Sequence, residues 1–202
     1  MKVLVACEEN QRVCMAFRKR GHEAYSCDIM DCSGGHPEWH IKDDVLKHLD
    51  EGWDLIIAHP PCTYLTVAGA SNIPRQPWRV AEGHKAAEFF MKLYNAPCDK
   101  ICVENPVPMK QFGLPPYSQI IQPYQFGELA TKRTCLWLKG LPELKPTKVL
   151  DKTLIPKSVW TYSKTGQKKS CSKWYNCGEK DRSIKRSKTF QGIAEAMAEQ
   201  WG

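Results

Sequence analysis

The chain contains the stretch Leu55-Ile56-Ile57-Ala58-His59-Pro60-Pro61-Cys62 and, further along, a second one, Lys100-Ile101-Cys102-Val103-Glu104-Asn105-Pro106. Each is a short apolar run that ends in polar residues, which is typical of a buried parallel strand. In an open α/β sheet, ligands bind beyond the carboxyl ends of the strands. The two stretches therefore predict a thiol and a carboxylate that face one crevice.

The rest of the chain alternates between strand and helix patterns. Further strands are expected over 2–6, 23–27, 120–121 and 134–138, beside those over 54–58 and 100–103. Apolar residues at helical spacing predict helices over 11–20, 80–94 and 193–201, with a short helix between 43 and 49 and a long polar loop over 63–78. Strands that alternate with helices in this way favour a doubly wound α/β sheet.

Composition indicates a soluble globular protein. The chain has 202 residues, of which 42% are hydrophobic and 25% charged, enough for one domain with a sizeable core. The apolar run 3–7 is too short for a signal peptide or a membrane span, so we expect a cytoplasmic protein with no membrane contact. The ten cysteines are then expected to be reduced and mostly structural.

The positive charge is concentrated in the last third of the chain. Between Lys145 and Lys188, thirteen Lys and Arg face three acids, a local charge of +10 within a total of +7. Four aromatic residues, Trp160, Tyr162, Trp174 and Tyr175, lie among these lysines. Positive charge with stacking aromatics suits a nucleic-acid strand, although a solvated lysine-rich face or a packed minor subdomain would look the same. We expect a catalytic domain over 1–140 plus 189–202 and a small basic insert over 141–188.

Several short motifs occur in the order found in one enzyme family. Pro60-Pro61-Cys62, then Ala68-Gly69, then a helix and Val103-Glu104-Asn105 resemble the cytosine-5 DNA methyltransferases. Gly21-His22-Glu23 and Gln191-Gly192-Ile193-Ala194 are similar to the opening unit and the closing motif of that family. The resemblance covers most of 1–140 and 189–202 and looks like a compact, phage-type relative. It implies a Rossmann-like sheet that binds S-adenosylmethionine and acts on DNA, either a duplex with a flipped cytosine or a single strand.

Cytosine methylation explains why a thiol and an acid should occur together. Carbon 5 of the ring is a poor nucleophile, and a thiolate that adds to carbon 6 makes carbon 5 enamine-like. Cys62 is therefore the candidate nucleophile, aimed by the rigid prolines before it. Glu104 would hold or protonate the ring nitrogen next to the amino group, for which a raised pKa at a buried strand end is expected. Asn105 is expected to fix the local turn.

The resemblance also implies residues that contact the nucleic acid. Lys132-Arg133-Thr134 stands where the family carries a glutamine-arginine-arginine pattern, so Arg133 is the candidate support of the flipped base, with Lys132 second. In the family, the loop after the thiol closes over the base, and Arg75 and Arg79 would then contact phosphates. Ordinary surface arginines are the alternative. In the basic insert the candidates are Lys168, Lys169 and Trp174.

The cofactor site departs from the family pattern. The first turn, Val5-Ala6-Cys7-Glu8-Glu9-Asn10, has no glycine, which the family normally carries there for close backbone approach. Asp28 at the end of the second strand would bind the ribose hydroxyls, and Asp44 or Asp43 the adenine amino group. The remaining cofactor-binding candidates are Glu8, Glu9, Pro60 and Gly192.

Two other functions remain open. Methyltransferases of amino groups carry an acid-Pro-Pro-aromatic motif, whereas His59-Pro60-Pro61-Cys62 lacks both the acid and the aromatic. A catalytically degenerate fold that binds nucleic acid or a host protein without turnover would explain the turn without glycine.

A metal site is not expected. Cysteine and histidine residues occur in two groups, but neither group matches a zinc spacing pattern. The first group is Cys27, Cys32, His36 and His40, and the second is Cys171 and Cys177.

Overall fold

The computed structural model describes residues 1–161, 167–172 and 187–202. Its centre is a seven-stranded sheet with the order β3-β2-β1-β4-β5-β7-β6. The strands are β1 (Lys2–Ala6), β2 (Glu23–Asp28), β3 (His40–Lys42), β4 (Leu55–Ala58), β5 (Ile101–Pro106), β6 (Gln119–Ile121) and β7 (Thr134–Lys139). The first five are mutually parallel, and β7 runs antiparallel to both of its neighbours. This is a doubly wound, Rossmann-like α/β sheet, as the sequence predicts.

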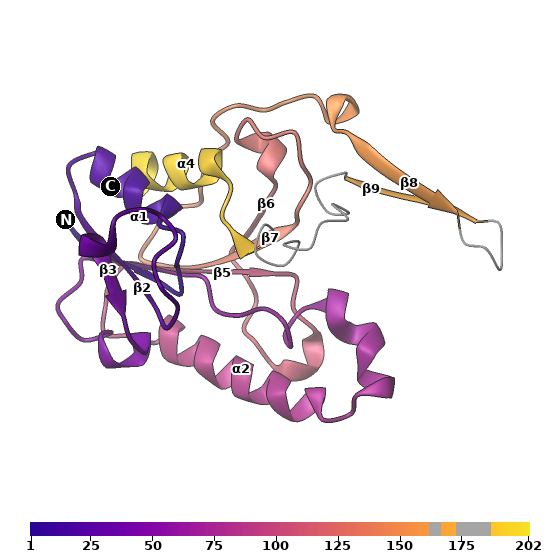
Figure 1. The fold of residues 1–202 in the computed structure, drawn as a ribbon, viewed down its shortest axis with the longest axis horizontal. Helices are drawn as coiled ribbons and strands as arrows, with labels where there is room; N and C mark the ends of the chain where they lie inside the picture. Colours follow the sequence, from indigo (N-terminus) through magenta and orange to yellow (C-terminus); the bar gives the residue numbers. More distant parts are fainter. Residues whose placement is uncertain (162–166, 173–186) are drawn as a thin grey trace.

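Helices cover both faces of the sheet (Figure 1). On one face lie α1 (Arg12–Lys19) and α4 (Gln191–Trp201), which pack against each other and against the strands. On the other face lies α2 (Arg79–Tyr94), which buries Phe90 and Leu93. Central strands in such a sheet are covered on both sides, which explains the unbroken apolar runs of β1 and β4.

Short 3-10 helices fill the connections. They are η1 (Pro37–Trp39), η2 (Val45–Lys47), η3 (Val67–Arg75), η4 (Lys110–Phe112), η5 (Pro123–Gln125) and η6 (Lys152–Leu154). The long polar loop predicted over 63–78 thus contains η3. The strand β3 was not expected from the sequence, because it has two half-buried residues and an exposed Lys42, with no clear apolar alternation.

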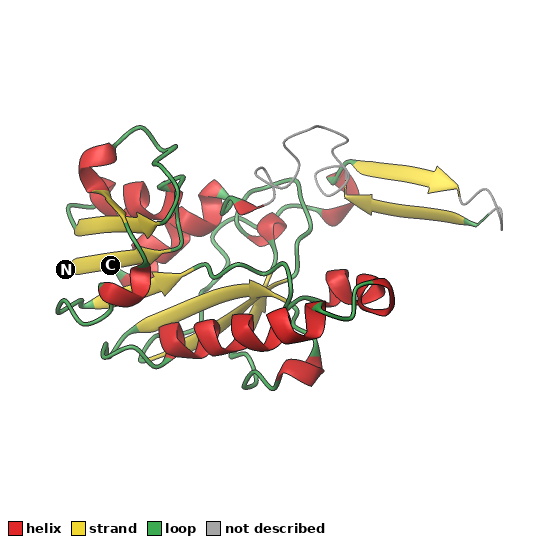
Figure 2. Cartoon of the chain, turned by 60° about the horizontal axis from the view of Figure 1, so that its bottom comes forward, coloured by secondary structure: helices red, strands yellow, loops and turns green. Residues whose placement is uncertain are grey.

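The basic stretch contains a hairpin of β8 (Lys157–Thr161) and β9 (Lys168–Ser172), which reaches away from the sheet (Figure 2). The sequence did not predict these strands. The beginning of the predicted insert belongs to the main core, since Leu144 is buried there and Lys145 exchanges two hydrogen bonds with Gln200 of α4. In the described part of the chain, no helix is both long enough and apolar enough to cross a bilayer.

Candidate active site at the carboxyl edge of the sheet

The polar strand ends predicted from the sequence come together at one edge of the sheet. Strands β4 and β5 are adjacent and parallel, with Ala58 paired to Val103, so the segments that carry Cys62 and Glu104 leave from neighbouring positions. Because β7 is antiparallel, it begins at this same edge, where Thr134 pairs with Pro106. Residues 132–133 therefore also reach the edge.

The loop that carries Cys62 is held against the segment that follows β5. The Cys62 carbonyl accepts hydrogen bonds from the amides of Leu65 and Thr66, at 3.2 and 3.3 Å. Leu65 in turn accepts from the Met109 amide, and Thr66 forms a bridge with Pro108. The Cys62 side chain is half-buried. The candidate nucleophile thus lies in a turn anchored to the strand exit of Glu104.

Glu104 is paired with His59, a residue that the sequence analysis did not single out. Nδ1 of His59 lies 3.1 Å from Oε2 of Glu104, and the two side chains are only 8% and 12% exposed. Burial raises the pKa of Glu104, but the charge of Lys132 and the hydrogen bond and charge of His59 outweigh burial and hold the pKa below its ordinary value of 4.5. The predicted raised pKa is therefore wrong, because both partners come from other elements of the fold.

Three buried polar atoms at this edge have no hydrogen-bond partner among the described residues. They are Nε2 of His59, Oε1 of Glu104 and Oδ1 of Asn105. Asn105 is fully buried and donates through Nδ2 to the Pro60 carbonyl, at 3.3 Å, which fixes the turn as predicted. An unsatisfied buried polar group costs about 1–3 kcal/mol. Three of them on adjacent strand ends indicate a place where a ligand completes the hydrogen bonding.

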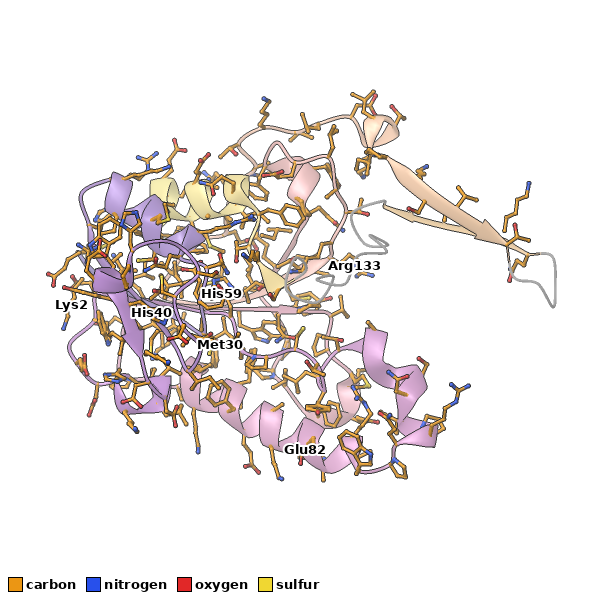
Figure 3. All side chains as sticks on the ribbon, in the orientation of Figure 1. Lys2, Met30, His40, His59, Glu82 and Arg133 are labelled. Atoms are coloured by element: carbon orange, nitrogen blue, oxygen red, sulfur yellow. The ribbon has the colours of Figure 1, made fainter. Side chains whose placement is uncertain are left out.

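The two basic residues before β7 differ in their surroundings. Lys132 is half-buried, its amide donates to Oε1 of Gln122, and its charge acts on Glu104. Arg133 is exposed (Figure 3). Burial of the neighbouring Cys135 outweighs the opposing charge of Arg133 and raises the pKa of that thiol to about 11. Lys132, ranked second from the sequence, is thus the residue whose charge reaches the candidate acid.

Glu8 has a role inside the protein that the sequence did not predict. It is 2% exposed, and its two carboxylate oxygens accept from the amides of Val13 and Cys14 in the first turn of α1, at 2.7 and 3.1 Å. Burial raises its pKa, which the charge of His59 and these two amides partly offset. Both oxygens of Glu8 thus already accept hydrogen bonds within the protein, and its role as a cofactor contact stays a prediction. The backbone carbonyl of Glu9 accepts from the Ser33 amide, and its carboxylate accepts from the Ser33 hydroxyl.

The first turn keeps a glycine-like conformation without glycine. Cys7 has φ of 59°, and Gln11 at the start of α1 has φ of 58°. Left-handed backbone costs a non-glycine residue about 1–2 kcal/mol, so this turn is held by its surroundings. Burial, together with the charges of Asp28, Cys27 and Asp44, raises the pKa of the Cys7 thiol. The two acids predicted to bind the cofactor therefore lie close to this turn.

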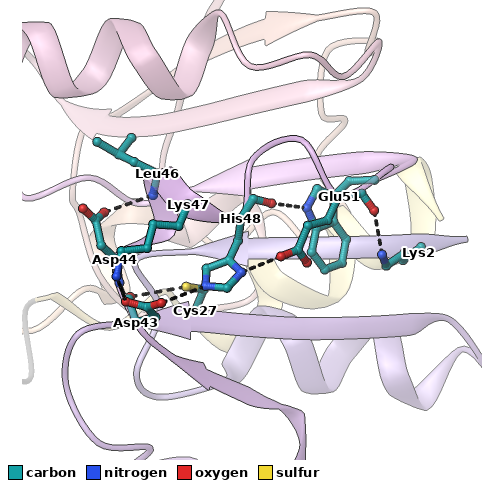
Figure 4. A network of polar contacts seen from close by, with 9 residues as sticks. Lys2, Cys27, Asp43, Asp44, Leu46, Lys47, His48 and Glu51 are labelled. Atoms are coloured by element: carbon teal, nitrogen blue, oxygen red, sulfur yellow. Dashed lines mark hydrogen bonds and ion pairs between the residues drawn. The ribbon is translucent and has the colours of Figure 1, made fainter.

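Both of these acids also have hydrogen bonds within the protein. Asp28 accepts from the Met30 amide at 2.9 Å, and Asp44 accepts from the Leu46 amide at the start of η2. Asp43 belongs to a network in which it pairs with Lys47 and His48, and His48 pairs with Glu51 (Figure 4). Carboxylates at the ends of β2 and β3 are suitable acceptors for ribose hydroxyls and an adenine amino group.

The other predicted contacts are distributed more widely. Pro60 is buried, and Gly192 packs so closely on the Phe126 carbonyl that a Cβ would lie 1.8 Å from its oxygen. Arg79 donates to the Thr63 carbonyl at 2.8 Å and lies over the Tyr64 ring, so it supports the loop next to Cys62. Arg75 and Lys168 are exposed. Lys169 is placed by its backbone alone, and Trp174 lies outside the described residues.

The described residues contain no group of three or more side chains that could hold a metal ion. Cys171 is placed by its backbone alone, and Cys177 lies outside the described part of the chain.

No protein-family model matches this sequence, and no curated protein matches it. Among solved structures, the chain is similar to a prophage-encoded protein of E. coli that is proposed to be a DNA modification methyltransferase. The two chains are 12% identical with a TM-score of 0.47, and the match covers 82% of this chain. This chain spans 61% of the length of that protein.

Proposed function

We propose that this chain is an S-adenosylmethionine-dependent DNA methyltransferase that acts on carbon 5 of cytosine. The observation that carries the proposal is the position of Cys62 and Glu104 on the exits of adjacent parallel strands, at an edge where three buried polar atoms lack partners among the described residues. A thiol and a carboxylate at one edge are the two groups that covalent activation of a pyrimidine ring requires.

In this mechanism, the Cys62 thiolate adds to carbon 6 of the cytosine, and the electron pair of the 5,6 double bond becomes available at carbon 5. Glu104 is a carboxylate near neutral pH, because its pKa is lowered. Its free oxygen accepts a hydrogen bond from the amino group or from the ring nitrogen once that nitrogen is protonated. After transfer, carbon 5 loses its proton to solvent, and the electron pair of that bond re-forms the 5,6 double bond. The bond from sulfur to carbon 6 breaks at the same time, which restores the thiolate.

S-adenosylmethionine, when bound, supplies the electrophilic methyl group. The residues that fit it are Asp28 and Asp44, whose carboxylates lie at the ends of β2 and β3 close to the Cys7 turn. The left-handed backbone at Cys7 supports a tight first turn in place of the missing glycine. The exposed Arg75 and Lys168 are proposed to contact nucleic-acid phosphates, in a duplex or a single strand.

The second candidate function is a nucleic-acid-binding or host-protein-binding fold without turnover. One observation favours it, because Glu8 already uses both of its carboxylate oxygens for the amides of Val13 and Cys14. Against it, a protein that only binds has no need of both the Cys62 thiol and the Glu104 carboxylate at the ends of β4 and β5.

Methyl transfer from labelled S-adenosylmethionine to cytosine-containing DNA, followed by nucleoside analysis, tests the proposal. We expect 5-methylcytosine from the wild type and none from Cys62→Ser. A methyl group on the amino nitrogen would contradict the carbon mechanism. Tight DNA binding with no cofactor binding, in folded protein, would favour the second candidate.

A further inference from the structure

His59 interacts with two buried acids. Its Nδ1 contacts Oε2 of Glu104, on the neighbouring strand β5, at 3.1 Å. Its charge also acts on Glu8, in the turn between β1 and α1. The His59 side chain is only 8% exposed, and a buried polar group of this kind calls for an explanation. The mechanism proposed above assigns His59 no role.

The position of the proton on His59 follows from Glu104. A carboxylate only accepts hydrogen bonds, so Nδ1 must carry the proton and donate it to Oε2, whichever charge the ring has. Oε2 is thereby occupied and the carboxylate plane is held in place. Oε1 is buried and has no hydrogen-bond partner in the described part of the chain, so it is the oxygen that remains for a ligand.

We propose that His59 is a positioning residue, which holds Glu104 so that Oε1 meets the amino group of the target base. This inference rests on the proposed function. An oxygen that can only accept pairs with the amino group at position 4 of cytosine and opposes the keto oxygen that thymine and uracil carry there. Lys132, whose charge also acts on Glu104, and Glu8, beside His59, are the other charged groups that bear on the pair.

Three variants of His59 distinguish positioning from simple filling of space. In His59→Asn the amide nitrogen stands where Nδ1 stood and can donate to Oε2. In His59→Gln the amide lies further out, near the former Nε2, and His59→Ala has no donor. Because misplacement of a catalytic group costs up to about a hundredfold, we expect kcat to fall roughly tenfold to a hundredfold in the Gln and Ala variants. We expect His59→Asn to retain most of the activity and the preference for cytosine over uracil in oligonucleotides.

A measurement on the ligand-free protein does not depend on catalysis. In protein with carbon-13-labelled glutamate carboxyl groups, NMR titration follows Glu104, assigned from the Glu104→Gln spectrum. We expect its pKa to lie below 4.5 in the wild type and to rise in His59→Ala, with thermal melting used to confirm that each variant is folded.

The outcomes separate the two proposals. Equal titration of Glu104 in the wild type and in His59→Ala would overturn the positioning role. So would an active wild type whose kcat and base preference are unchanged by His59→Ala or His59→Gln. A wild type without methyl transfer, in which Glu104 still titrates with His59, would overturn the methyltransferase function and support the positioning of Glu104.

Discussion

Two halves of the same sheet edge satisfy their polar groups in opposite ways. In the first half, formed by the ends of β1 to β3, Glu8 accepts from two helix amides and Asp43 pairs with Lys47 and His48. In the second half, formed by the ends of β4 and β5, three buried atoms of His59, Glu104 and Asn105 have no hydrogen-bond partner within residues 1–161, 167–172 and 187–202. The first half is thus a self-supporting frame, and the difference supports the proposal that a substrate completes the hydrogen bonding in the second half.

The largest expected effect is that of Cys62→Ser in the second half. If the thiolate forms the covalent bond, methyl transfer falls at least about a thousandfold, as for other enzymes that lose their nucleophile. The matched control is Cys32→Ser, because the Cys32 thiol donates to Gln11 in the first half and a hydroxyl can do the same. A loss in the control equal to that in Cys62→Ser would contradict the special role of Cys62.

Glu104→Gln comes next, with a loss of methyl transfer of roughly a hundredfold or more. The amide oxygen would face the proton on His59, and the amide nitrogen would then present a donor to the amino group of the base. The carboxylate of Glu104, with its lowered pKa, stabilises the fold above pH 4.5, and this contribution is lost as the pH falls below 4.5 toward the folded pKa.

Unfolding of the wild type and of Glu104→Gln at several pH values measures the contribution of Glu104 to stability. Assays of methyl transfer measure its contribution to activity. Equal activity of the two proteins would contradict the role of Glu104 as the oxygen that meets the base.

Glu8→Gln should act on stability, as a residue of the frame. The amide would place a donor against the amide of Val13 or Cys14, so the free energy of unfolding should fall by about 1–3 kcal/mol. Urea denaturation measures the change, and Glu23→Gln, on an exposed residue, is the control. An unchanged midpoint in Glu8→Gln would show that the helix amides do not depend on this carboxylate.

Asp28→Asn tests whether the frame also binds the cofactor. Loss of a charged acceptor for a hydroxyl should weaken S-adenosylmethionine binding about tenfold, measured by calorimetry. Asp50→Asn, in an exposed turn, is the control. Unaltered binding in Asp28→Asn would place the ribose elsewhere.

The smallest effect is expected at His48. Its hydrogen bond to Glu51 and the one to Asp43 raise the pKa of His48 above 6.5, although burial opposes this. Its contribution to stability is therefore fully present below pH 6.5 and is lost as the pH rises through the folded pKa. His48→Gln should remove this dependence, seen as a flatter plot of melting temperature against pH between 6 and 8. An unchanged slope would contradict the contribution of the network.

The sequence predicted the parts of this protein that depend on local pattern. The buried runs of β1, β4 and β5 and the helical spacing of α2 are visible in the chain, and they place Cys62 and Glu104 on adjacent strand exits. The edge strand β3 and the hairpin of β8 and β9 were missed, since His40–Lys42, Lys157–Thr161 and Lys168–Ser172 carry little apolar alternation.

The electrostatics of the site could not be predicted in the same way. The pKa of Glu104 depends on Lys132 and His59, which other elements bring to it, so burial alone gave the wrong direction. Glu8 reaches the amides of α1 because Cys7 and Gln11 in the same turn have positive φ. Positive φ could not be predicted there, since the turn contains no glycine. His59 could have been found from its position, because a histidine that directly follows a buried apolar strand lies at the edge of the sheet where the site is expected.

Covalent trapping tests the central claim most directly. The wild-type protein is incubated with S-adenosylmethionine and DNA that contains 5-fluorocytosine, in which fluorine replaces the hydrogen that must leave carbon 5. We predict a stable complex whose mass equals protein plus methylated DNA, with the link mapped to Cys62 and absent from Cys62→Ser. Active protein that methylates ordinary DNA but forms no such complex, or forms it through another residue, would contradict the proposed mechanism.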